Sequence, residues 1–359
     1  MQIICAEVTL EFGPWSVSDA SGEANNGKKV MSTTPAAHCS VASKWSVAIF
    51  SSRETEATLL LSIAAAARAV AGVEAVIDVI INGNPLIADG IGRHIVEIGR
   101  FLGNRPPIRV WSIGIADKSN ALNQYIHEIW PGSEIAFFID GYVQVLPDAL
   151  VHIGNGLEKA RDALAGSGVA TMGRSAQAHR KSGEPHGNLF AIRGQVLVDF
   201  RRVGFRLPLG LYRTDATLFA VIRFSLNPAE HEWDPRRILV VPQATWIFRP
   251  LRWWKPNDIR SHVKRMMRQA QGDLENLAVR EHLALLKRRP EDLQGTTLEL
   301  VRSWIESSPA DATRTYLRNP LRLIAARRLL RSRTDWTKAA TPPALIFQSG
   351  SDKSVGTSA

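Results

Sequence analysis

Between residues 45 and 140 the chain alternates short apolar runs with longer segments of helical pattern. The expected strands are 45–50, 74–81, 108–114 and 134–140, and the expected helices between them are 51–72, 87–103 and 119–130. The first of these helices has serine at its expected N-cap, acidic residues in its first turn and glycine at its end, the usual signals of helix termini. Strands joined through helices pair in parallel by right-handed crossovers. The sequence therefore predicts an α/β fold whose mainly parallel sheet is covered by helices on both faces.

The alternation becomes less regular after residue 150. Residues 168–173, 186–194 and 236–250 are expected to be extended, residues 214–227 are expected to be helical, and residues 193–204 fit either state. From Asn257 onward the pattern is helical and rich in arginine. We therefore divide the chain into a flexible N-terminal extension (1–44), an α/β domain (45–250), a basic helical region (251–338) and a disordered tail (339–359).

The composition is that of an ordinary globular protein, with 45% hydrophobic and 22% charged residues. No stretch approaches the roughly 20 apolar residues that a membrane helix needs. The N-terminus lacks the basic and apolar regions of a signal peptide. The two cysteines, Cys5 and Cys39, do not support a disulfide framework or a cysteine metal site. We therefore expect a cytoplasmic protein without a membrane-spanning helix.

The net charge of +10 comes entirely from the C-terminal third of the chain. Residues 249–338 hold 20 Lys and Arg against 10 Asp and Glu, which leaves 24 of each sign elsewhere. Such a region suits an anionic partner, although a solvated helical surface is the more common explanation. The arginines of segment 320–333 spread around most of the helix and leave no clean apolar face, so peripheral contact with the inner face of a membrane stays an open alternative. A nucleic-acid partner is not expected, because it would explain the charge but not the ordered motifs below.

The stretch FFIDGYVQVLP (137–147) ends a buried apolar strand with a charged residue, Asp140. In open α/β sheets ligands bind outside the carboxyl ends of the strands, so an acid at such an end lies where a ligand would bind. Capping of the turn that follows would explain the same residue equally well. From its position alone, Asp140 is either a site ligand or a turn cap.

Four motifs follow one another between residues 45 and 222. They are WSVAIFSSRETEATLLLSI (45–63), ADKSNALNQYI (116–126), FFIDGYV (137–143) with the helix LPDALVHI after it, and HGNLFAIRGQVL (186–197) with LGLYRTDATLFAVI (209–222). In this order they resemble the motifs of family 2 glycosyltransferases, and the resemblance extends over residues 45–270. It implies a GT-A-like fold with a helical C-terminal extension. It also implies inverting transfer of a sugar from a nucleotide-diphosphate donor to a hydroxyl group of a saccharide or lipid-linked acceptor.

The resemblance assigns roles to two acids. Asp140 occupies the place of the metal motif, where a carboxylate would hold a divalent cation, Mg²⁺ or Mn²⁺, against the donor diphosphate. Asp215 occupies the second place of a Glu-Asp pair and would act as general base on the acceptor hydroxyl. Two positions depart from the pattern, because Tyr142 replaces the second acid of the metal motif and Thr214 replaces the first acid of the pair. The first departure leaves the metal requirement open, or shifts part of the charge neutralisation to basic groups such as Lys118, Arg265 or Arg268.

Further candidates surround these two acids. The candidates for donor binding besides Asp140 are Arg53, Glu56, Asn82, Lys118, Arg265 and Arg268, and those for acceptor binding are His186 and Asn188. Ordinary structural explanations compete with these roles: the start of a helix, an Asn-Gly turn, a solvated basic face and a loop histidine. Two other functions stay open. One is a non-catalytic GT-A-fold protein that binds a glycan or a nucleotide. The other is a nucleotidyltransferase, which usually needs a glycine-rich basic loop where this chain reads SSRETE.

Overall fold

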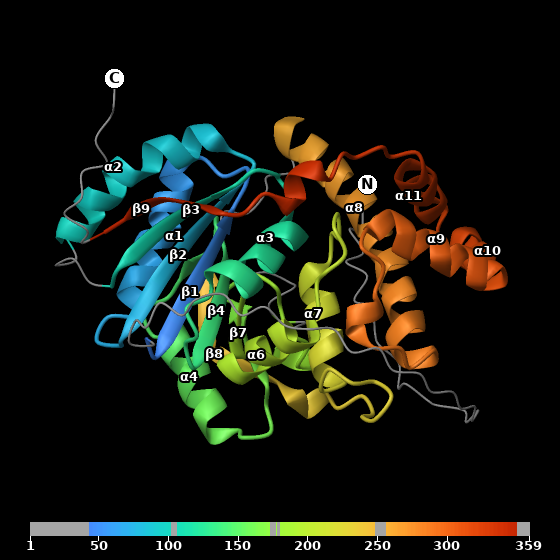
Figure 1. The fold of residues 1–359 in the computed structure, drawn as a ribbon, viewed down its shortest axis with the longest axis horizontal. Coiled ribbons are helices and arrows are strands. Elements are labelled where there is room, and N and C mark those ends of the chain that lie inside the picture. The colour runs from blue at the N-terminus through green and yellow to red at the C-terminus, as the bar shows by residue number, and fades with distance from the viewer. Residues whose placement is uncertain (1–42, 102–105, 173–176, 178–179, 248–255, 350–359) are drawn as a thin grey trace, which may run out of the picture. The chain divides into compact units, whose positions relative to one another are not determined.

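A computed structural model describes residues 43–101, 106–172, 177, 180–247 and 256–349 (Figure 1). The described residues form one sheet of nine strands in the order β5-β8-β6-β7-β4-β1-β2-β3-β9. The strands are β1 (Trp45–Ser51), β2 (Ala75–Asn82), β3 (Ile108–Ile113), β4 (Ile135–Asp140), β5 (Gln144–Val145), β6 (Ala165–Ala170), β7 (Leu189–Arg193), β8 (Ile238–Ile247) and β9 (Ala344–Gln348). The four strands expected before residue 141 are thereby confirmed.

The sheet is mixed rather than mainly parallel. Strand β1 pairs in parallel with β2 and β4, β2 with β3, and β6 with β8. The pairs β4–β7, β6–β7, β5–β8 and β3–β9 are antiparallel. The parallel prediction holds where strands alternate with helices, from β1 to β4. It fails at β7, because the chain turns back beside β6 instead of crossing over the sheet.

Helices account for most of the remaining described residues. They are α1 (Glu56–Ala69), α2 (Pro85–Phe101), α3 (Lys118–Gln124), α4 (Ala149–Lys159), α6 (Gly194–Val203), α7 (Thr214–Arg223), α8 (Pro256–Arg280), α9 (Thr297–Ser307), α10 (Pro309–Arg318) and α11 (Pro320–Leu330). The N-cap of α1 is Thr55, whose hydroxyl accepts the Thr58 N–H, and not the serine expected from the sequence. Segment 193–204, which the sequence left undecided, contains α6 and ends at Gly204 with a φ of 73°, a left-handed cap that glycine adopts without strain.

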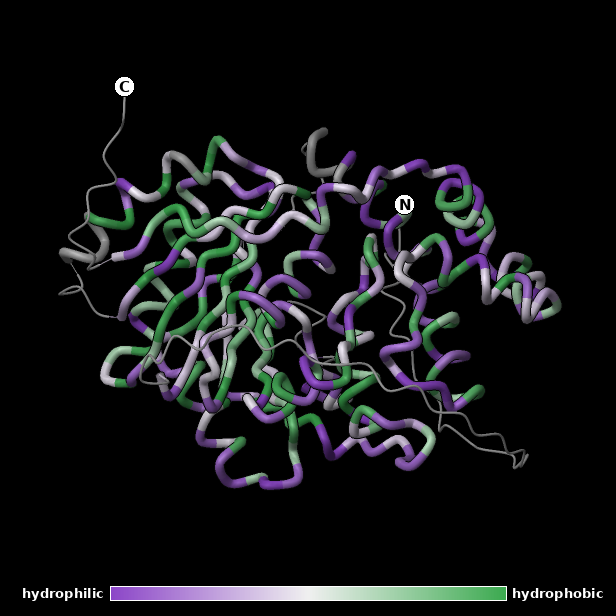
Figure 2. Tube along the Cα trace, viewed as in Figure 1, coloured by the Kyte–Doolittle hydropathy of each residue, from purple (hydrophilic) through white to green (hydrophobic). Residues whose placement is uncertain are grey.

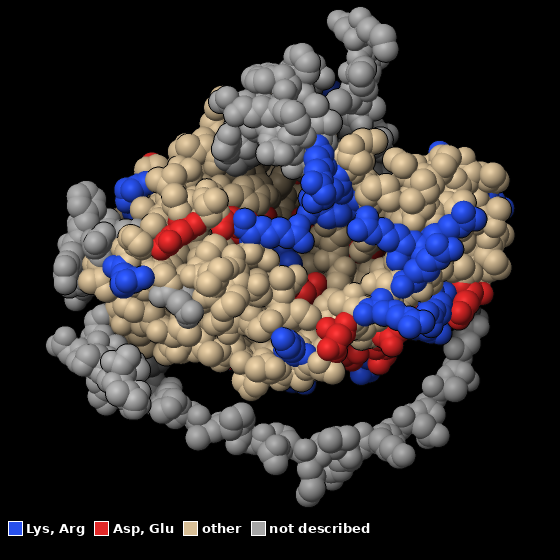
Figure 3. Space-filling model, turned by 90° about the horizontal axis from the view of Figure 1, so that it is seen from above, with Lys and Arg blue, Asp and Glu red and all other residues tan. Residues whose placement is uncertain are grey.

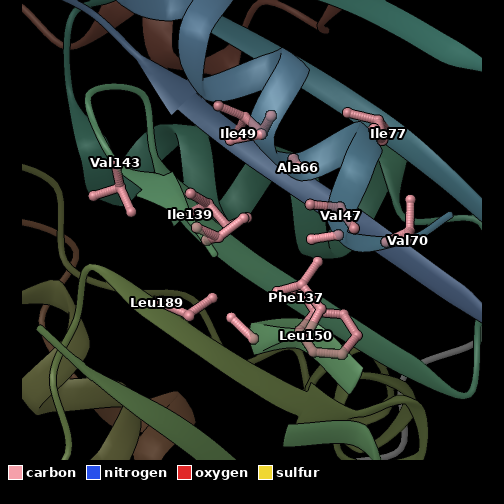
Figure 4. Packing of buried hydrophobic residues seen from close by; sticks show 14 of the residues in the cluster. Val47, Ile49, Ala66, Val70, Ile77, Phe137, Ile139, Val143, Leu150 and Leu189 are labelled. Atoms are coloured by element: carbon pink, nitrogen blue, oxygen red, sulfur yellow. The ribbon is translucent and has the colours of Figure 1, made fainter. Parts of the chain in front are cut away.

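The core lies against both faces of the sheet, because successive side chains of a strand point to opposite sides. On one face Val47, Ile49 and Phe137 pack beneath α1, α2 and α4, with Leu150 and Leu189 beside them (Figure 4). Figure 2 shows the hydrophobic stretches concentrated in these central strands, whereas the helices after residue 256 alternate hydrophilic and hydrophobic residues. The central sheet is therefore the main site of apolar burial.

An aromatic cluster fills the other face. The rings of Phe138 and Phe190 stack with centroids 4.7 Å apart, and Phe50 stacks on Phe138 at 6.1 Å. Tyr125, in the π-helical turn after α3, contacts Phe138 edge-on at 5.5 Å, and Phe219 of α7 contacts Phe190 at 5.3 Å. These contacts place α3 and α7 on the side of the sheet opposite α1, so helices cover both faces, as expected.

One buried ion pair joins β2 to β3. Asp78, which has no exposed surface, accepts hydrogen bonds from Arg109 Nε at 2.7 Å and Arg109 Nη2 at 2.9 Å. The indole Nε1 of Trp111 donates a third hydrogen bond to Asp78 at 2.9 Å. Asp78 and Arg109 are paired in the strand register. The polar residue that interrupts the apolar run of β2 is therefore satisfied entirely by the next strand.

The C-terminal helices pack on the α/β layers through α8. This helix contacts α7, α9 and α11 and continues as a π-helical turn, Glu281–Leu285. Helices α8 to α11 lie in the region for which the sequence predicts helical structure. The division between an α/β domain ending at 250 and a separate basic region remains a prediction. No helix of the described residues is long and apolar enough to cross a membrane.

The predicted disorder of the tail from residue 339 is wrong for residues 339–349. A short 3-10 turn, Thr337–Ala340, is followed by β9, which pairs with β3. Phe347 packs against the core, and Ser349 exchanges hydrogen bonds of 2.8 and 2.9 Å with the backbone of Ile108. The remainder of the tail, 350–359, and all but the last two residues of the expected extension 1–44 lie outside the described residues.

Candidate functional site

Asp140 and the segment after β1 meet at the carboxyl edge of the sheet. Phe50 and Asp140 are neighbours in the parallel register of β1 and β4. The Gly141 N–H donates a 2.8 Å hydrogen bond to the Phe50 carbonyl, and a Cβ atom at Gly141 would lie 2.9 Å from that oxygen. The close approach therefore requires glycine after the aspartate. It brings the turn after β4 against the residues that follow β1.

Lys118 is the direct partner of Asp140. It is the first residue of α3, and its Nζ lies 2.5 Å from Asp140 Oδ1. Asp117 caps this helix by accepting the Asn120 N–H at 2.8 Å. The side chains of Lys118 and Asp140 are 33% and 17% exposed, so the pair is partly buried and still reachable from solvent. The sequence motif around Lys118 and the strand-end aspartate thus form one site.

The charges around Lys118 are dominated by acids. Burial lowers the pKa of Lys118, but the carboxylates of Asp140, Asp215 and Glu54 together outweigh it and raise the pKa above its usual value. Burial raises the pKa of Asp140, and the negative charges of Asp215 and Glu54 add to this effect while Lys118 opposes it. A single lysine therefore faces three carboxylates. Because acidic groups outnumber basic ones, this cluster favours the binding of an additional positive charge.

Asp215 lies in the first turn of α7, near enough for its charge to act on both Lys118 and Asp140. Its carboxylate packs against the backbone of Gly187, where a Cβ atom would overlap Oδ2. Thr214, the residue before it, is 1% exposed and does not supply a second acid to the site. The structure thus brings together three residues that are far apart in sequence, Lys118, Asp140 and Asp215.

Glu54 is a site residue that the sequence reasoning missed. Its Oε2 accepts hydrogen bonds from the Ser51 hydroxyl at 2.9 Å, the Ser52 N–H at 2.7 Å and the Arg53 N–H at 3.0 Å. These bonds hold the turn after β1 beside Asp140. Its position in the sequence could have identified it. Glu54 is the first acid after a buried strand, so the strand-end argument applied to Asp140 applies to it as well.

Tyr142 and Asn188 close one side of the cluster. The Tyr142 hydroxyl donates to Asn188 Oδ1 at 3.1 Å, and the Asp140 N–H donates to the Asn188 carbonyl at 3.2 Å. Burial first, and the neighbouring Asp140 charge second, raise the pKa of Tyr142, so its hydroxyl keeps its proton. His186 accepts the Asn188 N–H on Nδ1 at 3.1 Å and packs edge-on against Trp246. The two acceptor candidates, His186 and Asn188, therefore lie on the segment that borders Asp140 and Asp215.

Three of the other donor candidates follow β1 or end β2. Arg53 is exposed beside Glu54. Glu56 lies 2.7 Å from His94 Nδ1 of α2, so its carboxylate already has a partner between the two helices. Asn82 ends β2 and is 4% exposed, with Oδ1 unpaired among the described residues, so it would reach a ligand only after a change of side-chain rotamer. The roles of these three residues in donor binding remain predictions.

Arg265 and Arg268 are exposed on α8. The guanidinium of Arg268 lies 5.5 Å from the ring centroid of Tyr212, which precedes α7. Figure 3 shows lysine and arginine side chains gathered around a hollow on the face seen from above, with acidic side chains beside them. Basic side chains gathered around a hollow suit a ligand that carries phosphate groups.

A divalent cation would find hard oxygen ligands in this cluster but not a complete set. No group of three metal-ligating side chains occurs among the described residues. Asp140 provides carboxylate oxygen, which suits Mg²⁺ or Mn²⁺, and Mg²⁺ sites use few protein carboxylates when phosphates and water supply the rest. The residues present therefore fit a cation that arrives with a diphosphate.

The comparisons with known proteins give structural similarity only. No protein-family model matches the sequence, and no curated protein matches it. Among 193 similar chains of solved structure is a mannosyltransferase from Pyrobaculum calidifontis, determined in complex with GDP-Man and Mn²⁺. It is 15% identical to this chain, with a TM-score of 0.49, and the alignment covers 81% of this chain and 85% of that one.

Proposed function

We propose that this chain transfers a sugar from a nucleoside-diphosphate donor to a hydroxyl group of an acceptor. The observation that carries the proposal is the cluster of Glu54, Asp140 and Asp215 around Lys118 at the carboxyl edge of the sheet. Open α/β sheets bind ligands at this edge, and the cluster combines a cation with carboxylates on three separate elements. That combination is what displacement of a diphosphate by a hydroxyl requires.

Lys118 and Asp140 form the donor side of the proposed site. The bond between the anomeric carbon and the diphosphate oxygen breaks during transfer, and negative charge accumulates on the departing diphosphate. The ammonium of Lys118 would stabilise this charge directly. A divalent cation held by Asp140, if bound with the donor, would add Lewis-acid stabilisation of the same oxygens. The exposed Arg265 and Arg268 on α8 would contribute further positive charge.

Asp215 forms the acceptor side. The attacking hydroxyl must lose its proton as its oxygen bonds to the anomeric carbon, and a carboxylate within hydrogen-bonding reach can take that proton. Direct displacement by this hydroxyl would invert the configuration at the anomeric carbon. The Asp215 carboxylate packs against Gly187, which lies between the acceptor candidates His186 and Asn188 in the sequence. The acceptor is a saccharide or a lipid-linked saccharide in this proposal.

The position of Tyr142 favours one alternative. A protonated, hydrogen-bonded tyrosine stands where the family pattern has its second metal-binding acid, and Thr214 is buried where the pattern has another acid. A chain that kept the fold and lost these acids would bind a nucleotide or a glycan without catalysis. Binding of a nucleotide sugar without release of the nucleoside diphosphate would identify this alternative.

The test is release of nucleoside diphosphate from UDP-, GDP- and CDP-linked sugars, with mixed oligosaccharides or polyprenyl-phosphate sugars as acceptors, by the wild type and Asp215→Asn. We expect one donor class to be consumed, with a loss of about 10²–10⁴-fold in Asp215→Asn, because a positioned general base contributes about that factor. Asp311→Asn, on the exposed side of α10, is the matched control and is expected to keep the wild-type rate. An Asp215→Asn variant as active as the wild type would overturn the assignment of the base.

A further inference from the structure

The segment that precedes Asp215 is held from two sides. Residues 205–213, here called the 205–213 loop, connect α6 to α7. On the first side, Asn123 of α3 accepts the Leu207 N–H at 2.8 Å and donates to the Leu207 carbonyl at 2.9 Å. Asp117 Oδ2 accepts the Gly210 N–H at 3.1 Å. The loop is thereby tied to the helix that begins with Lys118.

On the second side, Glu275 of α8 binds the end of the 205–213 loop. Its carboxylate accepts the Tyr212 N–H at 3.0 Å and the Arg213 N–H at 3.1 Å, and Gln271 Nε2 donates to it at 2.8 Å. The Glu275 side chain has no exposed surface. All three partners are donors, so an ionised carboxylate satisfies them and a carboxamide would satisfy only some.

A buried carboxylate at this position is costly unless these hydrogen bonds compensate it. Burial raises the pKa of Glu275, while the hydrogen bonds from Gln271, Tyr212 and Arg213 oppose the rise. An apolar side chain would fill the same space on α8 without that desolvation cost. The N-cap of α7, Arg213, has no side-chain capping hydrogen bond. The two amide groups that Glu275 binds therefore belong to the N-cap residue and the residue before it, two and three residues before Asp215.

The side chain of Arg213 is held by α8 as well. It donates to Gln269 Oε1 at 2.7 Å and to Asp273 Oδ1 at 3.0 Å, and a Cβ atom at Gly272 would lie 2.6 Å from its Nε. Arg322 of α11 donates to the other oxygen of Asp273 at 2.8 Å. Contacts with α8, which α11 supports, thus hold Arg213 at the end of the 205–213 loop. Because Arg213 is the N-cap of α7, these contacts also fix where α7 begins.

We propose that Glu275 is a positioning residue for Asp215. Glu275 binds the Tyr212 and Arg213 amides and so determines where the first turn of α7 places the Asp215 carboxylate. This inference rests on the proposed function, because it takes Asp215 as the base. It also gives the C-terminal helical region a role in the reaction, because α8 fixes the position of Asp215 in a site whose other residues lie at the strand ends and on α3. Glu275 itself lies behind the loop and does not contact substrate.

The experiment compares Glu275→Gln with Glu281→Gln, a matched control on the π-helical turn after α8. Glu281 accepts hydrogen bonds from the hydroxyls of Ser307 and Ser308, at the junction of α9 and α10. We expect Glu275→Gln to lower kcat for nucleoside-diphosphate release about 10–100-fold, because small displacements of a catalytic group have effects of this size. KM for the donor is expected to change by less than about threefold. Amide hydrogen exchange is expected to rise in peptides that cover residues 205–216 and to stay unchanged there in Glu281→Gln.

A double variant separates positioning from general structural damage. If Glu275 acts through Asp215, then Glu275→Gln combined with Asp215→Asn is expected to be no slower than Asp215→Asn alone, within about twofold. Multiplicative losses, or a wild-type kcat in Glu275→Gln, would overturn the positioning role while leaving the proposed function intact. A wild type that consumes none of the donors would remove the proposed function, and the role of Glu275 with it.

Discussion

Replacement of Arg109 by methionine tests how the buried carboxylate of β2 is stabilised. Arg109→Met removes two hydrogen bonds and the opposite charge from Asp78, which has no exposed surface and keeps only the Trp111 Nε1 bond of 2.9 Å. Removing one partner of a buried ion pair typically costs about 3–5 kcal/mol, because the remaining charge is desolvated without compensation. We expect a loss of that size in the free energy of unfolding near neutral pH, measured by urea denaturation with tryptophan fluorescence.

The pH dependence of Arg109→Met gives a second, signed expectation. Burial raises the pKa of Asp78 even though Arg109 and Trp111 lower it, so loss of Arg109 raises the pKa further. An acid whose pKa is higher in the folded state binds more protons there, and stability then falls as the pH rises toward that folded pKa. The variant should therefore regain stability as the pH falls below the raised folded-state pKa of Asp78, by at most about 1.4 kcal/mol per pH unit.

The double variant Asp78→Asn/Arg109→Met is the control for this prediction. An amide at position 78 keeps an oxygen for Trp111 Nε1 and carries no charge, so it should recover at least about half of the lost free energy and remove the added pH dependence. A loss below about 1 kcal/mol in Arg109→Met, or a loss that does not change with pH, would refute the reasoning.

Two glycine substitutions test the other close contacts. Gly187→Ala is expected to lower nucleoside-diphosphate release about 100-fold with the fold intact, because its Cβ atom would displace the Asp215 carboxylate; an unchanged rate would contradict the location of Asp215. Gly83→Ala is expected to destabilise by more than about 2 kcal/mol in urea denaturation, because Gly83 has a φ of +69° and its added Cβ atom would lie 2.4 Å from Ala116 N. Gly72→Ala, with a φ of +82° and open space around the added atom, is the control and should lose only about 1–2 kcal/mol; equal losses in the two variants would show that the contact with Ala116 has no cost.

The first half of the fold was predictable because its signals are local. Apolar runs and crossover length suffice to predict β1 to β4 and the helices between them, and the strand-end rule makes Asp140 a candidate ligand with a turn cap as the alternative. The same rule would have selected Glu54, had it been applied to β1. The association of Lys118 with Asp140 was not derivable from periodicity, and it came from the resemblance between ordered motifs.

The remaining features depend on contacts between residues that are far apart in sequence. Strand β9 is short and exposed. It forms because it pairs with the edge strand β3 and because Phe347 packs against the core. The antiparallel direction of β7 depends on how the chain turns after β6. The role of Glu275 depends on two backbone amides more than 60 positions away, and a lone glutamate in a helical pattern gives no sign of such partners.

The most direct test of the proposed function is calorimetric binding of UDP, GDP and CDP to the wild type and to Asp140→Ala, each with and without Mn²⁺, with Asp311→Asn as the control. We expect one nucleotide to bind the wild type and Asp311→Asn alike, Mn²⁺ to strengthen that binding, and Asp140→Ala to weaken it about tenfold or more, which corresponds to about 1.4 kcal/mol. Binding of no nucleotide under any condition, or equal binding to Asp140→Ala, would contradict the assignment of a donor site to this edge of the sheet.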